Sequence, residues 1–361
     1  MTYSKSGNHV DKFGGGGDSV STPQLSVCIV FHNEEVRARK CLEALALQPL
    51  EFICEVILID NASTDETYSI LKGSSAKLPF PTRVHKRETN NLGAARAEAM
   101  IAATARYVAF IDADIIVPSD WALRFSESIR LHLQSDRQIA GLAGANSPDV
   151  SSPWGAASSL IFRYVNLGSP QVAQASGVES VLHVSTCNVV FDREAVIRVG
   201  NFNASFKVVC EDVELCCRLR RLGYELLFLK GHEVIHAQAS SPLEWLRRSA
   251  RYGYGNMRVV SLYREFFSRR HWTSLVAGAV LLGLCALVLI LPVAASALIF
   301  ALLCCVAGLS FLITLRHRSS GSTARVFLLL IAIPTGYALG HIAGLFAFHV
   351  PVFKSHQRVH P

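Results

Sequence analysis

Two aspartates one residue apart, Asp112 and Asp114, end a short apolar run that begins at Tyr107. Carboxylates with this spacing can direct oxygens at one hard divalent cation, and such ions bind carboxylates together with substrate phosphates. The pattern is short, and a strand that ends in turn-forming aspartates explains it equally well. The rest of the chain has to distinguish a metal site from a turn.

Polar side chains also follow two earlier apolar runs. Leu25–Phe31 and Glu55–Ile59 have the composition of buried strands. The polar residues that come after them are Asn33, Glu34, Asp60 and Asp65. Because the carboxyl ends of parallel strands lie at one edge of a sheet, we expect these side chains to face the same crevice as the two aspartates.

Helical patterns separate these runs. Val36–Gln48 and Ala94–Ala105 have helical spacing or composition, and Arg83–Lys86 is a further short strand. The alternation predicts an α/β fold with a mostly parallel, doubly wound sheet. No Gly-x-Gly-x-x-Gly motif follows the first strand, so a Rossmann-type dinucleotide site is not expected.

The C-terminal part has the composition of a membrane protein. Trp272–Leu315 contains no Lys, Arg, Asp or Glu, and one bilayer crossing needs about 20 residues. Pro292 divides this stretch into two expected spans, Ser274–Leu291 and Val293–Leu315. Val326–Val350 is expected to be a third span that ends outside, with a re-entrant or interfacial segment as the competing interpretation.

Positive charge accompanies the apolar segments. From Leu215 to Pro361 there are 16 Lys and Arg residues against four Asp and Glu. This placement favours membrane lipids or phosphorylated substrates as partners, and no nucleic-acid partner is expected. Basic residues around Arg270 and in 316–318 flank the two spans. The expected spans predict a protein integral to the cell (inner) membrane. The positive-inside rule then predicts that its α/β domain is cytoplasmic.

The stretch Leu243–Phe267 combines Trp and Tyr with Arg, which is typical of a helix at the lipid headgroup level. Arg247, Arg248 and Arg251 in this stretch could bind a diphosphate or a lipid-linked phosphate, for which a planar guanidinium is well suited.

The ten cysteines show neither Cys-x-x-Cys spacing nor a disulfide framework, which predicts buried, reduced thiols. The polar N-terminus lacks a signal-peptide pattern and is expected to be flexible. These patterns divide the 361 residues into an N-terminal tail (1–24), an α/β domain (25–240), interfacial helices (241–271), a transmembrane region of two to three helices (272–350) and a C-terminal tail (351–361).

Several motifs together resemble family 2 glycosyltransferases, which have the GT-A fold. Ser26–Glu35, Val56–Asp65, Asn91–Arg96 and Tyr107–Asp114 are similar to the nucleotide-sugar-binding half of that family. Residues 211–219 match its Glu-Asp-x-Glu-Leu-x-x-Arg-Leu pattern in the acceptor half. The resemblance covers about residues 25–260.

One motif departs from part of the family. Processive members carry Gln-x-x-Arg-Trp, whereas residues 247–256 of this chain read Arg-Arg-Ser-Ala-Arg-Tyr-Gly-Tyr-Gly-Asn. The stretch is closer to succinoglycan-type exopolysaccharide transferases than to cellulose or hyaluronan synthases.

The resemblance implies a donor site. Asp60 would accept a hydrogen bond from a base such as uracil, and Arg96 would lie near the phosphates. Asp114, with Asp112 touching ribose or ion, would bind Mn²⁺ or Mg²⁺. The full set of implied nucleotide-sugar residues is Asn33, Glu34, Asp60, Asp65, Arg96 and Asp112, with Arg247, Arg248 and Arg251. Some relatives have a metal-ligand histidine in this region, which makes His236 a candidate metal ligand, although a lone histidine after a strand is more often structural.

The resemblance also implies catalytic residues. Asp212 would be the general base that takes a proton from the acceptor hydroxyl, and Glu211 would orient its surroundings. The alternative is that both acids merely favour the start of a helix through its dipole.

The expected function is that of an inverting glycosyltransferase. It would move a sugar from a nucleoside-diphosphate sugar, which we expect to be UDP-linked, to a lipid-linked or glycan acceptor in polysaccharide or glycolipid biosynthesis. One alternative is a polyprenyl-phosphate sugar synthase of the dolichyl-phosphate mannose or glucose synthase type. The other is a non-catalytic membrane scaffold with a degenerate transferase domain.

Overall fold

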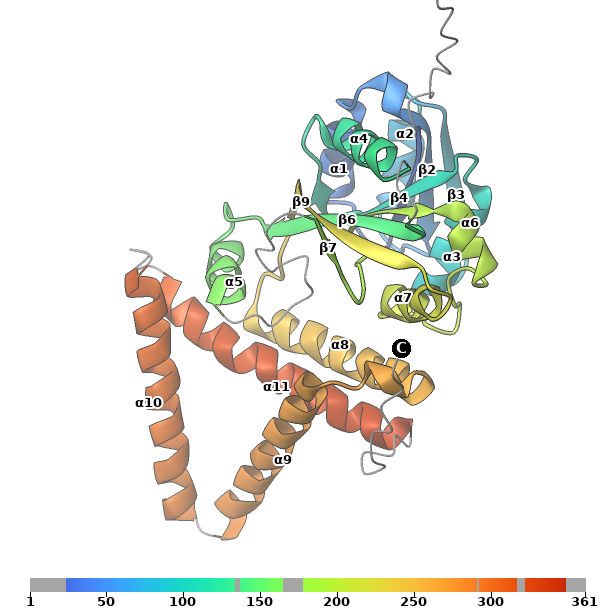
Figure 1. The fold of residues 1–361 in the computed structure, drawn as a ribbon. Helices are drawn as coiled ribbons and strands as arrows, with labels where there is room; N and C mark the ends of the chain where they lie inside the picture. Colours follow the sequence, from blue (N-terminus) through green and yellow to red (C-terminus); the bar gives the residue numbers. More distant parts are fainter. Residues whose placement is uncertain (1–23, 134–136, 165–177, 291, 317–321, 349–361) are drawn as a thin grey trace, which may run out of the picture.

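Four parallel strands form the N-terminal half of the sheet in this computed structural model, which describes residues 24–133, 137–164, 178–290, 292–316 and 322–348 (Figure 1). Their order in the sheet is β3-β2-β1-β4. The strands are β1 (Leu25–Phe31), β2 (Ile53–Asn61), β3 (Thr82–Arg87) and β4 (Tyr107–Asp112). This half confirms the predicted α/β arrangement.

The second half of the sheet mixes strand directions. The order continues β8-β6-β9-β5, and β7 pairs with β9. β8 is antiparallel to both β4 and β6, whereas β6 and β9 are parallel. The expectation of a mostly parallel sheet therefore holds for the first half only, because β8 returns the chain in the opposite direction. These strands are β5 (Ile115–Ile116), β6 (Ile139–Pro148), β7 (Val178–Ser180), β8 (Asn188–Asp192) and β9 (Glu225–His236).

Helices cover both faces of the sheet. Alternate residues of β1 enter different cores: Val27 and Ile29 pack on one side, and Cys28 packs on the other. The first core includes residues of α1 (Ala38–Ala46), α2 (Thr67–Ser75) and α4 (Trp121–Leu133). The second includes residues of α3 (Leu92–Ala102), α6 (Arg193–Arg198) and α7 (Glu211–Arg221). The helix α5 (Pro153–Tyr164) lies towards the C-terminal helices.

Two predicted boundaries differ for identifiable reasons. α3 begins at Leu92 rather than Ala94, because the side chain of Asn91 accepts the Ala94 N–H at 3.0 Å and caps the helix. The strand expected before His236 is longer than a short apolar run, because β9 continues from Leu229 through to His236 itself. Gly231 has φ +90° and lies between Leu229 and His236, and the pairing register with β6 shifts there, so the strand passes through an irregularity without ending.

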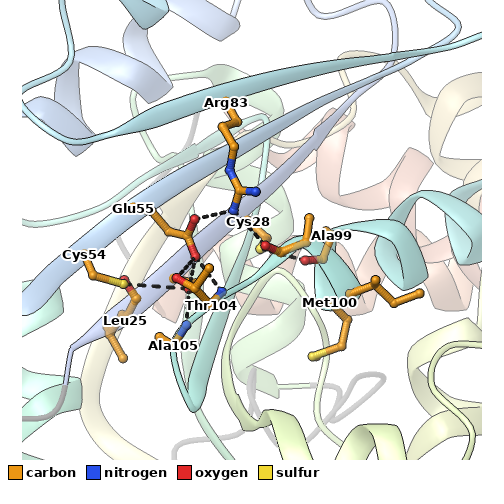
Figure 2. A network of polar contacts seen from close by, with 12 residues as sticks. Leu25, Cys28, Cys54, Glu55, Arg83, Ala99, Met100, Thr104 and Ala105 are labelled. Carbon is orange, nitrogen blue, oxygen red and sulfur yellow. Dashed lines mark hydrogen bonds and ion pairs between the residues drawn. The ribbon is translucent and has the colours of Figure 1, made fainter.

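A buried carboxylate joins the amino ends of the central strands (Figure 2). Glu55 of β2 accepts hydrogen bonds from the Ser26 hydroxyl at 2.6 Å and from the Thr104 N–H and hydroxyl at 2.6 and 2.7 Å, and it pairs with Arg83 of β3. Burial raises the pKa of this carboxyl, but the hydrogen bonds from Ser26 and Thr104 outweigh burial and hold the pKa below the ordinary value of 4.5. One side chain thus ties β1, β2, β3 and the segment before β4.

The C-terminal region is helical. It contains α8 (Pro242–Leu262), a short 3₁₀ turn (Arg264–Phe266), α9 (Arg269–Ile290), α10 (Pro292–Arg316) and α11 (Thr323–Ala347). Figure 1 shows α9 and α10 extending away from the sheet domain as a V, with α11 crossing their upper ends beside α8. The predicted break at Pro292 is confirmed, since α10 begins there.

Two helices among the described residues are long and apolar enough to cross a membrane. They are the segment Ser296–Arg316 of α10 and the whole of α11. The expected N-terminal tail, except Gln24, lies outside the described residues. So do the expected C-terminal tail and residues 317–318 of the expected basic loop.

α8 and α11 run side by side in the same direction. At their starts, Trp245 belongs to one cluster with Val326 and Leu329. Near their ends, Met257 packs near Phe348. The two helices therefore lie side by side over about three turns of α8.

The Glu55 contacts predict a pH-dependent stability. Glu55→Gln is expected to lower the free energy of unfolding by about 1–3 kcal/mol at neutral pH, because the buried hydrogen bonds lose their charged acceptor. A folded-state pKa below the ordinary value means that this stabilisation is complete above 4.5 and disappears as the pH falls through the lower, folded-state pKa. Thermal unfolding of the detergent-solubilised protein across acidic pH measures both effects.

The matched control is Glu225→Gln. Glu225 pairs with Arg137 at the surface, where an ion pair contributes about 0–1 kcal/mol. Equal losses for the two variants at every pH would contradict the role assigned to Glu55.

Candidate active site

Three residues whose side chains could bind a metal ion lie close together at the edge where the parallel strands end. Asp112 ends β4 and Asp114 follows it, while His236 ends β9. The short antiparallel pairing of β5 with β9 places Ile115 opposite His236 and so brings the two strand ends together. His236 Nε2 lies 3.2 Å from Asp114 Oδ1, and one ligand atom from each of the three residues lies within 4.8 Å of the others. These three residues are called the cation group below.

The cation group suits a divalent ion. Burial, followed by the neighbouring Asp114 charge, raises the pKa of Glu34. Burial also raises the pKa of Asp112, and Arg96 offsets that only in part. Burial acts likewise on Asp114, but His236 outweighs it and lowers the pKa of that carboxyl. A cation would relieve this crowding of acids, and two carboxylates with an imidazole could hold a divalent ion.

A buried guanidinium stands behind the cation group. Arg96 of α3 donates to Asp112 at 2.9 Å and also pairs with Glu211 at the start of α7. Its side chain is 6% exposed and that of Glu211 is 2% exposed, so the pair is removed from water. Arg96 lines the crevice, but two carboxylates already engage its charge. The expected places of Arg96 beside nucleotide phosphates and of Glu211 as an orienting residue remain predictions.

Asp212 is more accessible than its neighbour. It lies in the first turn of α7, after Cys210 in a left-handed conformation with φ +66°. Its Oδ1 accepts the Val213 N–H at 2.8 Å and its Oδ2 accepts the Thr186 N–H at 3.4 Å. Asp212 is partly exposed, and its charge contributes to the raised pKa of Asp112, so it lies near the cation group.

A crevice of about 320 Å³ adjoins the cation group. One wall is formed by the ends of β1 and β4, and the other by the beginning of α8. Its polar lining residues are His32, Glu34, Arg37, Arg96, Asp112, Asp114, His236, Gln238, Glu244, Arg248, Arg251 and Tyr252. Another cavity, of about 360 Å³, lies at the opposite edge of the sheet beside Tyr107 and is lined by none of the predicted site residues.

Positive charge enters the crevice from α8. Burial opposes the charge on Arg248, but Tyr252 and Asp114 outweigh it and raise the pKa of Arg248, so the guanidinium stays protonated. Arg251 is exposed and also lines the crevice. The third predicted arginine, Arg247, is exposed but is not part of the lining. Neighbouring positions on a helix point about 100° apart, which explains the separation.

The loops after β1 and β2 hold each other. Asn33 Oδ1 accepts the Thr64 N–H at 2.8 Å. Asp65 accepts the Glu35 N–H at 3.2 Å and the Thr67 N–H at 3.1 Å. Asn33 and Asp65 therefore fix the loops that border the crevice and do not themselves line it.

Asp60, near the end of β2, does not line the crevice either. It is fully buried, and among the described residues neither of its carboxylate oxygens has a hydrogen-bond partner. A buried carboxylate without a donor is costly, so this position favours a ligand that brings an N–H group.

Sequence reasoning missed Tyr252, His32 and Arg37 as lining residues. Tyr252 comes four positions after Arg248 and thus shares its helix face, a spacing that points to it. Arg37 comes three positions after Glu34 and pairs with it at 3.2 Å. His32 carried no such signal, because its position depends on the fold of the loop after β1.

Comparison with known proteins gives consistent similarities. Residues 26–200 match the family model described as glycosyl transferase family 2. The probable glycosyltransferase YdaM of Bacillus subtilis is 25% identical over 257 residues, which cover 68% of this chain and 58% of YdaM. The glycosyltransferase AglE of Haloferax volcanii is 27% identical over 251 residues, which cover 68% of this chain and 78% of AglE.

A solved structure has a similar fold. The mannosyltransferase PcManGT of Pyrobaculum calidifontis, in complex with GDP-Man and Mn²⁺, superposes with a TM-score of 0.57 at 16% identity. The superposition covers 87% of this chain and 88% of the mannosyltransferase. This likeness includes the GT-A sheet.

Proposed function

The chain belongs to the family 2 glycosyltransferases, and on that premise we propose that it is an inverting enzyme of the cytoplasmic membrane face. It moves a sugar from a nucleoside-diphosphate sugar to a lipid-linked or glycan acceptor.

The supporting observation is the meeting of opposite charges in one crevice. The cation group lies at the sheet edge, and Arg248 and Arg251 face it from α8. A diphosphate fits between a divalent cation and guanidinium groups. Mn²⁺ or Mg²⁺ held by Asp112, Asp114 and His236 would supply neutralisation of the charge that develops on a nucleoside-diphosphate leaving group.

Asp60 is the proposed partner of the donor base, although it does not line the crevice in this structure. Its two unpaired carboxylate oxygens can accept N–H groups such as that of uracil. The solved mannosyltransferase holds GDP-Man, and guanine also offers N–H donors, so GDP stands beside UDP as a donor nucleotide.

Asp212 is the proposed general base. Its carboxylate takes the proton of an acceptor hydroxyl while the oxygen attacks the anomeric carbon, and the bond to the nucleoside diphosphate breaks. Attack from the face opposite the leaving group inverts the anomeric centre. The partial exposure of Asp212, in contrast to the buried Glu211, favours this division of roles.

The donor proposal predicts ligand stabilisation. A nucleoside diphosphate at ~100 times its dissociation constant, with Mn²⁺, is expected to add roughly 2.7 kcal/mol to the stability of the folded state. Thermal shift with UDP, GDP, dTDP and CDP, each with and without Mn²⁺, measures this. Asp114→Asn is expected to remove the effect of Mn²⁺, whereas Asp192→Asn, at the other edge of the sheet, is expected to keep it. No shift for any nucleotide would refute the donor site.

A polyprenyl-phosphate sugar synthase is the second candidate. The favouring observation is that the arginine-bearing wall α8 packs on the apolar helix α11, so a lipid phosphate could approach Arg251. A non-catalytic scaffold is disfavoured, because Asp60, Asp112, Asp114 and Asp212 are all present and three of them lie near one another.

Asp212→Asn separates the two enzyme candidates. With a hydroxyl acceptor, loss of the base is expected to lower kcat by about 10²- to 10⁴-fold. A phosphate acceptor is already ionised and needs no base, so the loss there is expected to be much smaller. Transfer assays with a glycan acceptor and with a polyprenyl phosphate distinguish these outcomes.

We further propose that α9 and α10 cross the membrane while α8 and α11 lie along its surface. α8 carries Arg247, Arg248, Arg251 and Arg258, and each arginine near the bilayer centre costs about 2.5–3.5 kcal/mol or more. Because α11 accompanies α8 along its length, both lie at the headgroup level. The expected third span is then replaced by the interfacial alternative.

This arrangement predicts the position of the chain end. An epitope appended after Pro361 is expected to be cleaved by protease from the same membrane face as the catalytic domain. An epitope inserted after Ile290 is expected to be cleaved from the opposite face. If both epitopes were cleaved from the face opposite the catalytic domain, α11 would be a third span.

A further inference from the structure

The contact between α8 and α11 is made by glycines. Gly336, Gly340 and Gly344 of α11 follow one another every four residues and face α8. A Cβ atom at Gly340 would lie 2.1 Å from the carbonyl oxygen of Ala250, and one at Gly336 would lie 2.4 Å from that of Leu246. Such distances are far inside van der Waals contact, so no larger residue fits without movement of a backbone. These three glycines are called the glycine seam below.

A glycine of α8 makes an equally close contact with α11. A Cβ atom at Gly253 of α8 would lie 2.5 Å from the carbonyl oxygen of Tyr337 and 3.0 Å from the amide nitrogen of His341. Small residues four apart on both helices allow the backbones to touch, a packing mode typical of apolar helices. Direct contact between the two backbones therefore sets the relative position of the helices, and such a contact deforms little.

The crevice lies beside the same stretch of α8. Arg248 and Tyr252, which line it, fall within two turns of Leu246 and Ala250, the residues whose carbonyls meet the seam. No residue of α11 lines the crevice.

The two ends of α8 have other supports. Its C-terminal half is fixed on the catalytic domain, because Gly255 faces Cys210 and Arg258 donates to the Ser205 carbonyl at 2.7 Å. Its first turn packs Trp245 against Phe162 of α5, with ring centroids 5.7 Å apart. Between these supports Arg248 and Tyr252 line the crevice, and Tyr252 also packs beside Cys210 of the catalytic domain. The helix that contacts this middle part of α8 extensively is α11.

From this arrangement we infer that Gly336 and Gly340 are positioning residues for the donor site: the seam sets how far Arg248 and Tyr252 reach across the crevice towards the cation group. The inference rests on the proposed function, since it concerns the site of the diphosphate. A helix in the membrane region thus determines affinity for a soluble substrate that it does not touch.

The test makes the same two substitutions at one glycine of the seam and at one control glycine. Gly340→Ala and Gly340→Leu are compared with Gly308→Ala and Gly308→Leu. Gly308 lies on α10, and no atom lies within 4 Å of the position that a Cβ atom would take there, so an added side chain meets no protein atom at its base. Full-length protein in lipid nanodiscs is titrated with UDP and with GDP in the presence of Mn²⁺. Thermal unfolding midpoints are recorded for every variant.

Gly340→Leu is expected to raise the dissociation constant of the bound nucleotide by about tenfold, equivalent to about 1.4 kcal/mol. Gly340→Ala is expected to give a smaller increase in the same direction, and both Gly308 variants are expected to stay at the wild-type value. If Gly340→Leu does not fold, Gly340→Ala carries the comparison. Wild-type affinity in the folded Gly340 variants would overturn the inference.

A double-mutant cycle separates positioning from general damage. In an Arg248→Gln background the guanidinium is gone, so Gly340→Ala is expected to cause little further loss of affinity. The same loss in both backgrounds would show that the seam does not act through Arg248 and would overturn the inference. Absence of nucleotide binding by the wild type would overturn the proposed function, and this inference with it.

Discussion

A buried arginine between two carboxylates holds the catalytic domain together. Arg96 binds Asp112 at the end of β4 and Glu211 at the start of α7, and these two elements are about a hundred positions apart in the chain. Removing one partner from a buried ion pair typically costs about 3–5 kcal/mol, because a charge is then left without compensation. The pair also engages Oδ1 of Asp112, so the geometry of the cation group depends on it.

Arg96 also offsets part of the negative charge of the neighbouring acidic side chains. Glu34, Asp112, Asp114 and Asp212 influence one another's ionisation at this edge of the sheet. Arg96 supplies positive charge from behind, and Arg248 supplies it from the α8 side. Contacts of this kind hold the side chains of the site in position before any ligand arrives, which is the preorganisation that charge-stabilising catalysis needs.

Local patterns in the sequence were sufficient for much of this site. Asp112, Asp114 and Glu34 follow strands that composition alone identifies, and parallel pairing brings strand ends to one edge. His236 was harder to place, because it reaches Asp114 only through the pairing of the two-residue strand β5 with β9. The Arg96 contact with Glu211 depends on how α3 and α7 pack, and no short-range pattern encodes that.

The C-terminal helices show the same limit. Apolar composition and Pro292 predicted α9 and α10 as a pair of helices. The glycines of α11 have a four-residue spacing, and this spacing matches that of Ser249 and Gly253 on α8. That match is a relation between two helices and becomes visible only when both are considered together.

Because α8 and α11 run in the same direction, the connecting hairpin must carry the chain back along nearly the whole of α11. α9 begins near His341, where Ser274 contacts it at 3.0 Å, and α10 ends near Thr323, where Thr314 contacts it at 2.8 Å. These points are separated by 18 residues of helix, or about 27 Å. The two legs consequently cannot pack along their length, as the V in Figure 1 illustrates, and large apolar side chains such as Leu302, Leu309 and Leu312 remain uncovered by protein. With α9 and α10 in the membrane as proposed, lipid acyl chains would fill the triangle, and the bilayer would then be a structural component of this region as well as its solvent.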